Sequence, residues 1–208
     1  HKIILDSWQE AAINSFHQGC HVVVDAPTTA GKTCIIEEIF HDRIKTKNFR
    51  SCYTTPVKSL ANDKYREFKE MFGSDSIGIA TGDLKENFHA PIIVATLETY
   101  RNSLLGSEPD LNRNLVIYDE YHYLQDKNRG SAWEEAMILT SQKTQMILLS
   151  ASIANPNQFV EWIEHITERK TKLIQTEKRP VPLVDLIWQQ NSWLLPKTYG
   201  IKIKNNNQ

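Results

Sequence analysis

The sequence predicts an α/β fold in which a mostly parallel β-sheet is covered by helices on both faces. Short apolar runs of strand length alternate with amphipathic stretches of helical length between residues 7 and 175. Such alternation implies right-handed crossovers between parallel strands. Residues suited to chemistry follow the ends of several strand-like runs, and open α/β sheets place their ligands at such strand ends.

The elements follow from apolar periodicity and from capping or breaking residues. Asp6 or Ser7 is suited to begin the first helix, Gly19 to end it, and Thr96 to cap the fourth helix. The expected strands cover residues 22–24, 51–55, 77–80, 92–95, 115–118, 146–149 and 172–175. The expected helices cover residues 7–18, 33–45, 58–72, 97–105, 133–139 and 155–163.

The third helix is strongly amphipathic. Four of its apolar side chains are expected to face inward: Leu60, Tyr65, Phe68 and Phe72. Its charged residues are interpreted as a solvated face: Lys64, Arg66, Glu67, Lys69 and Glu70. Three tryptophans lie on the apolar faces of expected helices and are expected in the core rather than as base-stacking platforms: Trp8, Trp133 and Trp162.

From Arg179 onward the alternation breaks down. We therefore expect one folded domain over residues 1–180, followed by an exit linker and a flexible tail over residues 181–208. The chain begins at His1 rather than at a methionine, and we expect it to be a fragment of a longer protein that is monomeric by itself.

Composition limits the class of protein. The 208 residues are 40% hydrophobic and 24% charged, which is ordinary for a soluble globular domain. A net charge of −1 argues against a polyanion-binding tail but allows a local basic face. No apolar run reaches the ~18 residues of a membrane helix. We therefore expect no membrane partner. The three cysteines fit neither a zinc pattern nor a disulfide framework, so we expect a reducing, intracellular location, cytoplasmic or nuclear.

Residues 26–33 have the form of a phosphate-binding loop. Ala-Pro-Thr-Thr-Ala-Gly-Lys-Thr follows a β-branched run and precedes an apolar helix, and only the first glycine of G-x-x-x-x-G-K-[ST] is replaced, by Ala26. Gly31 permits the tight turn that points backbone amides at an anion. Lys32 is suited to the β and γ phosphates, and the Thr33 hydroxyl to Mg²⁺. The alternative is a strand–turn–helix joint with a chance lysine. The remaining loop residues complete the candidate nucleotide site: Pro27, Thr28, Thr29 and Ala30.

A second candidate site follows the apolar run 115–118. Asp119 is placed to hold Mg²⁺, and Glu120 to orient and deprotonate an attacking water. The alternative is an exposed Asp-Glu pair on a loop.

In order along the chain, these motifs resemble those of DExH-box superfamily-two helicases. Asp119-Glu-Tyr-His122 resembles motif II, and residues 26–33 resemble motif I. Five further stretches are similar to other motifs of the family: residues 5–9, 55–61, 81–83, 94–101 and 150–152. Residues 129–135, Asn155-Pro156 and residues 179–182 resemble the superkiller-like branch, which includes exosome-associated RNA helicases.

The resemblance implies a RecA-like P-loop NTPase domain that uses ATP and Mg²⁺. It implies that Gln9 reads adenine, and that His122 links the hydrolysis site to the hydroxyls of Ser150 and Ser152. It also implies that single-stranded RNA crosses the same sheet edge with little sequence preference. Six residues match the contacting positions: Pro56, Lys58, Gly82, Thr96, Glu98 and Arg101.

Helicases of this kind use a second RecA-like domain that supplies an arginine. No QxxGRxGR-like stretch follows motif III. We therefore expect the second domain to be absent from this chain and turnover by the chain alone to be slow or nil. Two alternatives stay open: a DNA helicase or translocase, and a nucleotide-gated nucleic-acid-binding module without turnover.

Overall fold

The computed structural model describes residues 4–106, 110–121, 130–176, 187–189 and 192–194. The chain divides into two compact units, His1–Lys178 and Arg179–Gln208, and each is described by itself. In the second unit, two short strands, β9 (Ile187–Gln189) and β10 (Ser192–Leu194), pair antiparallel. This pairing was not expected, because no periodicity marks residues 189–208. The expected exit segment lies mostly outside the described residues.

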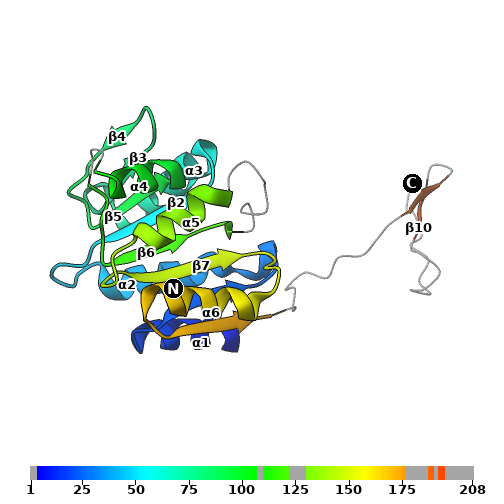
Figure 1. The fold of residues 1–208 in the computed structure, drawn as a ribbon. Helices are drawn as coiled ribbons and strands as arrows, with labels where there is room; N and C mark the ends of the chain where they lie inside the picture. The colour runs from blue at the N-terminus through cyan, green and yellow to red at the C-terminus, as the bar shows by residue number, and fades with distance from the viewer. Residues whose placement is uncertain (1–3, 107–109, 122–129, 177–186, 190–191, 195–208) are drawn as a thin grey trace. The chain divides into compact units, whose positions relative to one another are not determined.

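The first unit is built on an eight-stranded sheet of order β4-β3-β5-β2-β6-β7-β1-β8 (Figure 1). Among the described strands of this sheet, seven run parallel to one another, and β4 runs antiparallel to its neighbour β3. The strands are β1 (His21–Asp25), β2 (Ser51–Thr55), β3 (Ile77–Ala80), β4 (Lys85–Glu86), β5 (Ile92–Thr96), β6 (Leu115–Tyr118), β7 (Gln145–Ser150) and β8 (Thr171–Gln175). The predicted mostly parallel sheet is confirmed.

In the described part of the chain, six α-helices cover this sheet. They are α1 (Ser7–His17), α2 (Lys32–Arg43), α3 (Lys58–Phe72), α4 (Leu97–Leu104), α5 (Gly130–Leu139) and α6 (Pro156–Thr167). A capping box joins Asp6 and Gln9 at the start of α1, and the Thr96 hydroxyl caps α4 as expected. Figure 1 shows α4, α5 and α6 together on one face of the sheet.

Two hydrophobic clusters fill the two sides of the sheet, because successive strand residues point to opposite faces. Val22 and Val24 of β1 pack with α1, α2 and α3, whereas Val23 packs on the side of α4, α5 and α6. Trp133 is 1% exposed in the second cluster, and Trp8 and Trp162 pack against the clusters as expected.

The structure differs from the expected elements at several places, among them the start of α5 at Gly130 rather than Trp133. The two-residue strand β4 was not expected, and it passes so close to β3 that a Cβ on Gly78 would lie 2.2 Å from the Asn87 carbonyl oxygen. Helix α6 continues to Thr167. Leu60 was expected inward but lines a surface cavity, and Ala61 takes the buried position on α3.

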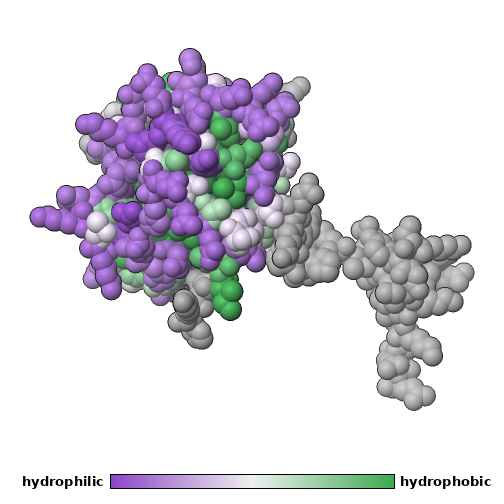
Figure 2. All heavy atoms as spheres, turned by 90° about the horizontal axis from the view of Figure 1, so that it is seen from below, coloured by the Kyte–Doolittle hydropathy of each residue, from purple (hydrophilic) through white to green (hydrophobic). Residues whose placement is uncertain are grey.

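The surface of this unit is largely hydrophilic on the face in Figure 2. Among the described residues, none of the helices combines the length and the apolar character needed to cross a bilayer. The same residues hold no cluster of three or more His, Cys, Asp or Glu side chains placed to bind a metal.

Candidate functional site

The phosphate-loop sequence forms a tight connection between β1 and α2. A single 3₁₀ turn, Thr28–Ala30, is followed by Gly31 at φ +84°, a left-handed conformation that favours glycine. A Cβ on Gly31 would also lie 3.0 Å from Gln9 Nε2. Helix α2 begins at Lys32, so its first amides and its positive dipole end face the loop.

Lys32 is buried within this loop. Its ammonium donates hydrogen bonds to the carbonyl oxygens of Ala26 at 2.8 Å and Pro27 at 3.3 Å. Burial lowers the pKa of Lys32, and the nearby carboxylates of Glu120 and Asp119 oppose that effect. The loop therefore holds a cation in place beside two carboxylates from another strand.

Gln9 joins the first helix to the loop. Its Nε2 donates to the Gly31 carbonyl at 2.9 Å, and its Oε1 accepts from the Asp6 amide at 2.8 Å. Both ends of this buried side chain are therefore bonded within the protein, and its predicted contact with adenine stays a prediction.

The carboxylates of Asp119 and Glu120 follow β6, which lies two strands from β1. The Asp119 amide donates to the Thr54 carbonyl at 3.0 Å, and the Glu120 amide donates to Asp119 Oδ1 at 2.9 Å. Glu120 has φ +55°, which is uncommon for a residue with a side chain and occurs preferentially at functional sites.

Tyr53 was not identified as a site residue from the sequence. Its phenol donates to Asp119 Oδ2 at 2.5 Å from the neighbouring strand β2. Burial raises the pKa of Asp119, while the hydrogen bond from Tyr53 and the positive charges of Lys64 and Lys32 lower it.

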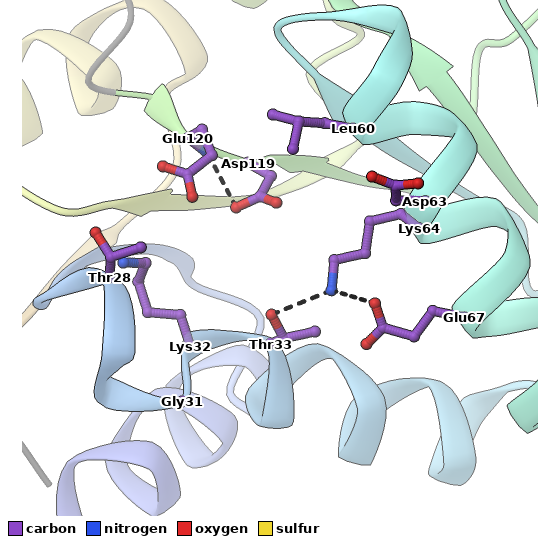
Figure 3. Close-up of a pocket in the computed structure, with 10 residues that line it drawn as sticks. All are labelled: Thr28, Gly31, Lys32, Thr33, Leu60, Asp63, Lys64, Glu67, Asp119 and Glu120. Atoms are coloured by element: carbon purple, nitrogen blue, oxygen red, sulfur yellow. Dashed lines mark hydrogen bonds and ion pairs between the residues drawn. The ribbon is translucent and has the colours of Figure 1, made fainter. Parts of the chain in front are cut away.

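A cavity of about 210 Å³ brings the two halves of the site together. Figure 3 shows the start of α2 on one side, the acidic pair after β6 on another, and α3 on a third. Ten residues line it: Thr28, Gly31, Lys32, Thr33, Leu60, Asp63, Lys64, Glu67, Asp119 and Glu120.

The contribution of α3 to this cavity corrects the expectation of a purely solvated charged face. Lys64 and Glu67 line the cavity, and the Lys64 ammonium lies 3.5 Å from Thr33 Oγ1 and 2.8 Å from Glu67 Oε2. No sequence pattern indicates this contribution, because the rotation of α3 about its axis decides which charged residues face the loop.

A second, larger cavity of about 680 Å³ is lined by all six residues that were predicted to contact nucleic acid. They come from the segments after β2, β3 and β5, which are distant in sequence. Both cations in the cavity are ion-paired: Lys58 with Asp83, and Arg101 with Glu135 at 3.4 Å. Its lining includes Pro56, Lys58, Gly82, Asp83, Thr96, Glu98, Arg101 and Trp133.

The residues predicted to couple the two cavities are only partly described. The Ser150 hydroxyl donates to the Ser152 carbonyl at 3.0 Å and accepts from the Ser152 amide at 3.2 Å. The Ser150 carbonyl accepts from the Ala26 amide at 3.0 Å, so β7 is tied to the phosphate loop. His122 lies outside the described residues.

This fold and this loop define a RecA-like P-loop NTPase domain. The chain belongs to the DEAD/DEAH box helicase family, whose model matches residues 6–159.

Similar proteins confirm the predicted resemblance to the superkiller-like branch. The chain is 42% identical over 186 residues to the DExH-box ATP-dependent RNA helicase DExH15 of Arabidopsis thaliana, covering 86% of this chain and 16% of that protein. It is 40% identical over 195 residues to the antiviral helicase SKI2 of Saccharomyces cerevisiae, covering 92% of this chain and 15% of that protein. This chain thus spans about a sixth of these relatives.

Solved structures agree on the fold. A hypothetical ATP-dependent RNA helicase from Sulfolobus tokodaii has a TM-score of 0.66 at 18% identity, with 84% of this chain and 53% of that chain covered. The DUF1998 helicase MrfA bound to DNA has a TM-score of 0.64 at 20% identity, with 83% and 26% covered.

Proposed function

We propose that this chain is the N-terminal, ATP-binding RecA-like domain of an ATP-dependent RNA helicase. The domain would span residues 1–180, with residues 181–208 leading out of it. The observation that carries the proposal is the convergence of Lys32, Thr33, Asp119 and Glu120 on one cavity. The anion-binding loop and the acidic pair follow strands that are far apart in sequence. The fold brings them to one cavity, and phosphoryl transfer requires both kinds of group at one site.

The residues present suit a magnesium nucleotide. Thr33 and Asp119 offer a hydroxyl and a carboxylate on the same cavity, and Mg²⁺ prefers such oxygen ligands, completing its shell with phosphates and water. When bound, Mg²⁺ would neutralise negative charge on the phosphates. The loop amides and Lys32 would bind the β and γ phosphates. The Glu120 carboxylate would accept a proton from the attacking water.

The larger cavity suits a nucleic-acid backbone. Its cations Lys58 and Arg101 can meet phosphates, and the amides at the start of α4 add a positive dipole end. Such contacts read little sequence. We infer single-stranded RNA as the ligand, because two of the similar proteins, DExH15 of Arabidopsis thaliana and mtr4 of Schizosaccharomyces pombe, are named ATP-dependent RNA helicases. Ser150, Ser152 and His122 would connect this cavity to the hydrolysis site.

Efficient turnover would need a second RecA-like domain of the same parent protein. An arginine supplied from outside the nucleotide site is worth about 10³–10⁵ in rate in related phosphoryl transfer. The relatives extend far beyond the matched segment, which leaves ample length for such a domain. The chain alone would therefore bind nucleotide weakly and turn it over slowly.

Nucleotide binding tests the first part of the proposal. A fluorescent ATP analogue (mant-ATP) with Mg²⁺ is titrated with the chain, with Lys32→Ala, and with Lys45→Ala as a control of equal charge change at an exposed site. We expect binding that Lys32→Ala reduces at least tenfold and that Lys45→Ala leaves unchanged. Equal binding by all three would contradict the proposed site.

Nucleic-acid preference separates the helicase alternatives. Binding of single-stranded oligo-U RNA and of the matching oligo-dU DNA is measured by fluorescence anisotropy, with and without Mg²⁺ and ATP. Preference for RNA supports the RNA assignment, and equal or better binding of DNA supports the DNA helicase or translocase. A parent protein that binds both ligands without turnover would be a nucleotide-gated binding module.

A further inference from the structure

The cavity of the phosphate loop holds a second cation besides Lys32. The Lys64 side chain is only 19% exposed and reaches in from α3, where its ammonium lies between Thr33 Oγ1 and Glu67 Oε2. The Lys64 ammonium nitrogen also lies 5.5 Å from the ring centre of Phe68, which is fully buried. Packing and an ion pair thus fix a long side chain at the rim of the site.

The two cations serve opposite sides of the cavity. Lys32 is bonded to the loop carbonyls of Ala26 and Pro27, whereas Lys64 approaches the hydroxyl of Thr33 (Figure 3). Lys64 also contributes more than Lys32 to lowering the pKa of Asp119. The charge of Lys64 therefore acts on the two groups suited to Mg²⁺.

We propose that Lys64 is a positioning residue that makes divalent-metal binding at Thr33 and Asp119 depend on the nucleotide. This inference rests on the proposed ATP site. A divalent ion at the Thr33 hydroxyl would come close to the ammonium, and repulsion between them is strong in a partly buried site. The phosphates of ATP add negative charge that offsets this repulsion, so the metal enters with the nucleotide rather than alone.

Glu67 gives the ammonium an alternative position. The Glu67 carboxylate already accepts a hydrogen bond from the Lys64 ammonium at 2.8 Å, and the Glu67 side chain is 42% exposed. Lys64 can therefore move away from Thr33 toward solvent and keep its bond to Glu67. Removing the Glu67 charge should hold Lys64 closer to Thr33 and weaken metal binding. Removing the Lys64 charge should strengthen it. The two substitutions are expected to act in opposite directions.

The test measures the metal dependence of nucleotide binding. Mant-ATP fluorescence is followed while Mg²⁺ is raised, for the chain, Lys64→Met, Glu67→Gln and the control Lys69→Met. Lys69 lies on the same helix but contacts Tyr65 rather than the cavity. Binding of Mn²⁺ alone is followed by electron paramagnetic resonance.

We expect Lys64→Met to lower the Mg²⁺ concentration for half-maximal binding about tenfold. Glu67→Gln should raise it about threefold, and Lys69→Met should leave it unchanged. Mn²⁺ alone should bind more tightly to Lys64→Met than to the unchanged chain. Thermal melting checks folding, and Lys64→Gln replaces Lys64→Met if the latter does not fold.

Two results would overturn the inference. An unchanged Mg²⁺ midpoint in a folded Lys64 variant would show that the ammonium does not affect the metal. Weaker mant-ATP binding at saturating Mg²⁺, with mant-ADP unaffected, would make Lys64 a ligand of the γ phosphate instead. Either result leaves the proposed ATP site intact, whereas an unchanged chain that binds no mant-ATP overturns the proposed function and this inference together.

Discussion

The phenol of Tyr53 donates a 2.5 Å hydrogen bond to the Asp119 carboxylate across two neighbouring parallel strands. Tyr53 pairs with Ile117 in the register of β2 and β6, so its side chain reaches the residue that follows β6. Tyr53 is fully buried, and Asp119 has its other oxygen bonded by the Glu120 amide. Two hydrogen bonds, one to each oxygen, therefore hold the carboxylate in one orientation.

Replacing Tyr53 with phenylalanine should loosen this carboxylate. Loss of a hydrogen bond to a charged, buried acceptor costs about 1.5–3 kcal/mol in the free energy of unfolding. Affinity for Mg²⁺ and mant-ATP should fall about tenfold or more, because Asp119 is no longer oriented. Tyr65→Phe, which removes a hydroxyl that donates to Glu86 at the surface, is the control. Equal affinity in Tyr53→Phe and Tyr65→Phe would show that Asp119 needs no support from β2.

Asp119→Asn should separate stability from binding. Burial raises the pKa of Asp119 above its usual 3.8, so the folded state disfavours the ionised carboxylate. This cost to stability is fully present above the folded pKa and disappears as the pH falls below the usual value. The single amide oxygen of asparagine can accept from only one of the two donors, Tyr53 or the Glu120 amide, and this loss offsets the relief of the buried charge. At pH 7 we therefore expect the asparagine variant to melt within about 2 °C of the unchanged chain and to lose Mg²⁺-dependent mant-ATP binding. A melting temperature lower by more than about 4 °C would contradict this prediction.

Glu135→Gln should strengthen RNA binding in the larger cavity. Arg101 is paired with Glu135, so a phosphate must compete with this carboxylate. Releasing the arginine should increase affinity for oligo-U RNA two- to threefold and steepen its salt dependence. Glu134→Gln is the matched control, since it removes the same charge from the exposed neighbouring residue. Equal gains in both variants would mean that net charge alone, and not the ion pair, decides binding.

His21 should make the domain sensitive to acid. Burial, and then the charge of Arg169, lower its pKa from 6.5 to about 4. In the folded state the Nδ1 of the neutral ring accepts a hydrogen bond from the buried Met146 amide. The unfolded chain binds the proton more readily, so stability is full above pH 6.5 and is lost as the pH falls toward 4. The loss attributable to His21 should approach about 3 kcal/mol.

Denaturant unfolding between pH 7 and pH 4 measures this loss. His21→Asn keeps an oxygen acceptor for the Met146 amide but does not titrate in this range, so it should lose less stability on acidification. Identical acid sensitivity in the two proteins would assign the effect to other groups.

The residues that a local sequence pattern defines were predictable. The phosphate loop and the acidic pair each follow a β-branched or apolar run at a fixed spacing, and a parallel sheet brings such strand ends to one edge. The six residues of the larger cavity were also named from motifs, and they line one cavity.

Residues that depend on tertiary placement were not predictable. Tyr53 reaches Asp119 only through the register of β2 against β6, and Lys64 reaches Thr33 only through the rotation of α3. Leu60 was expected inward because periodicity identifies an apolar face but cannot separate the sheet from the rim of a cavity. Strand β4 has two charged residues and offers no periodicity at all.

ATP binding and turnover by this chain, measured with and without single-stranded RNA and beside Lys32→Ala, test most directly whether the chain is the ATP-binding half of a helicase. We predict nucleotide binding that depends on Lys32, together with turnover that stays near background when RNA is added, because the arginine for turnover is proposed to come from a second domain. Robust RNA-stimulated turnover by the chain alone, or binding that Lys32→Ala does not change, would contradict this prediction.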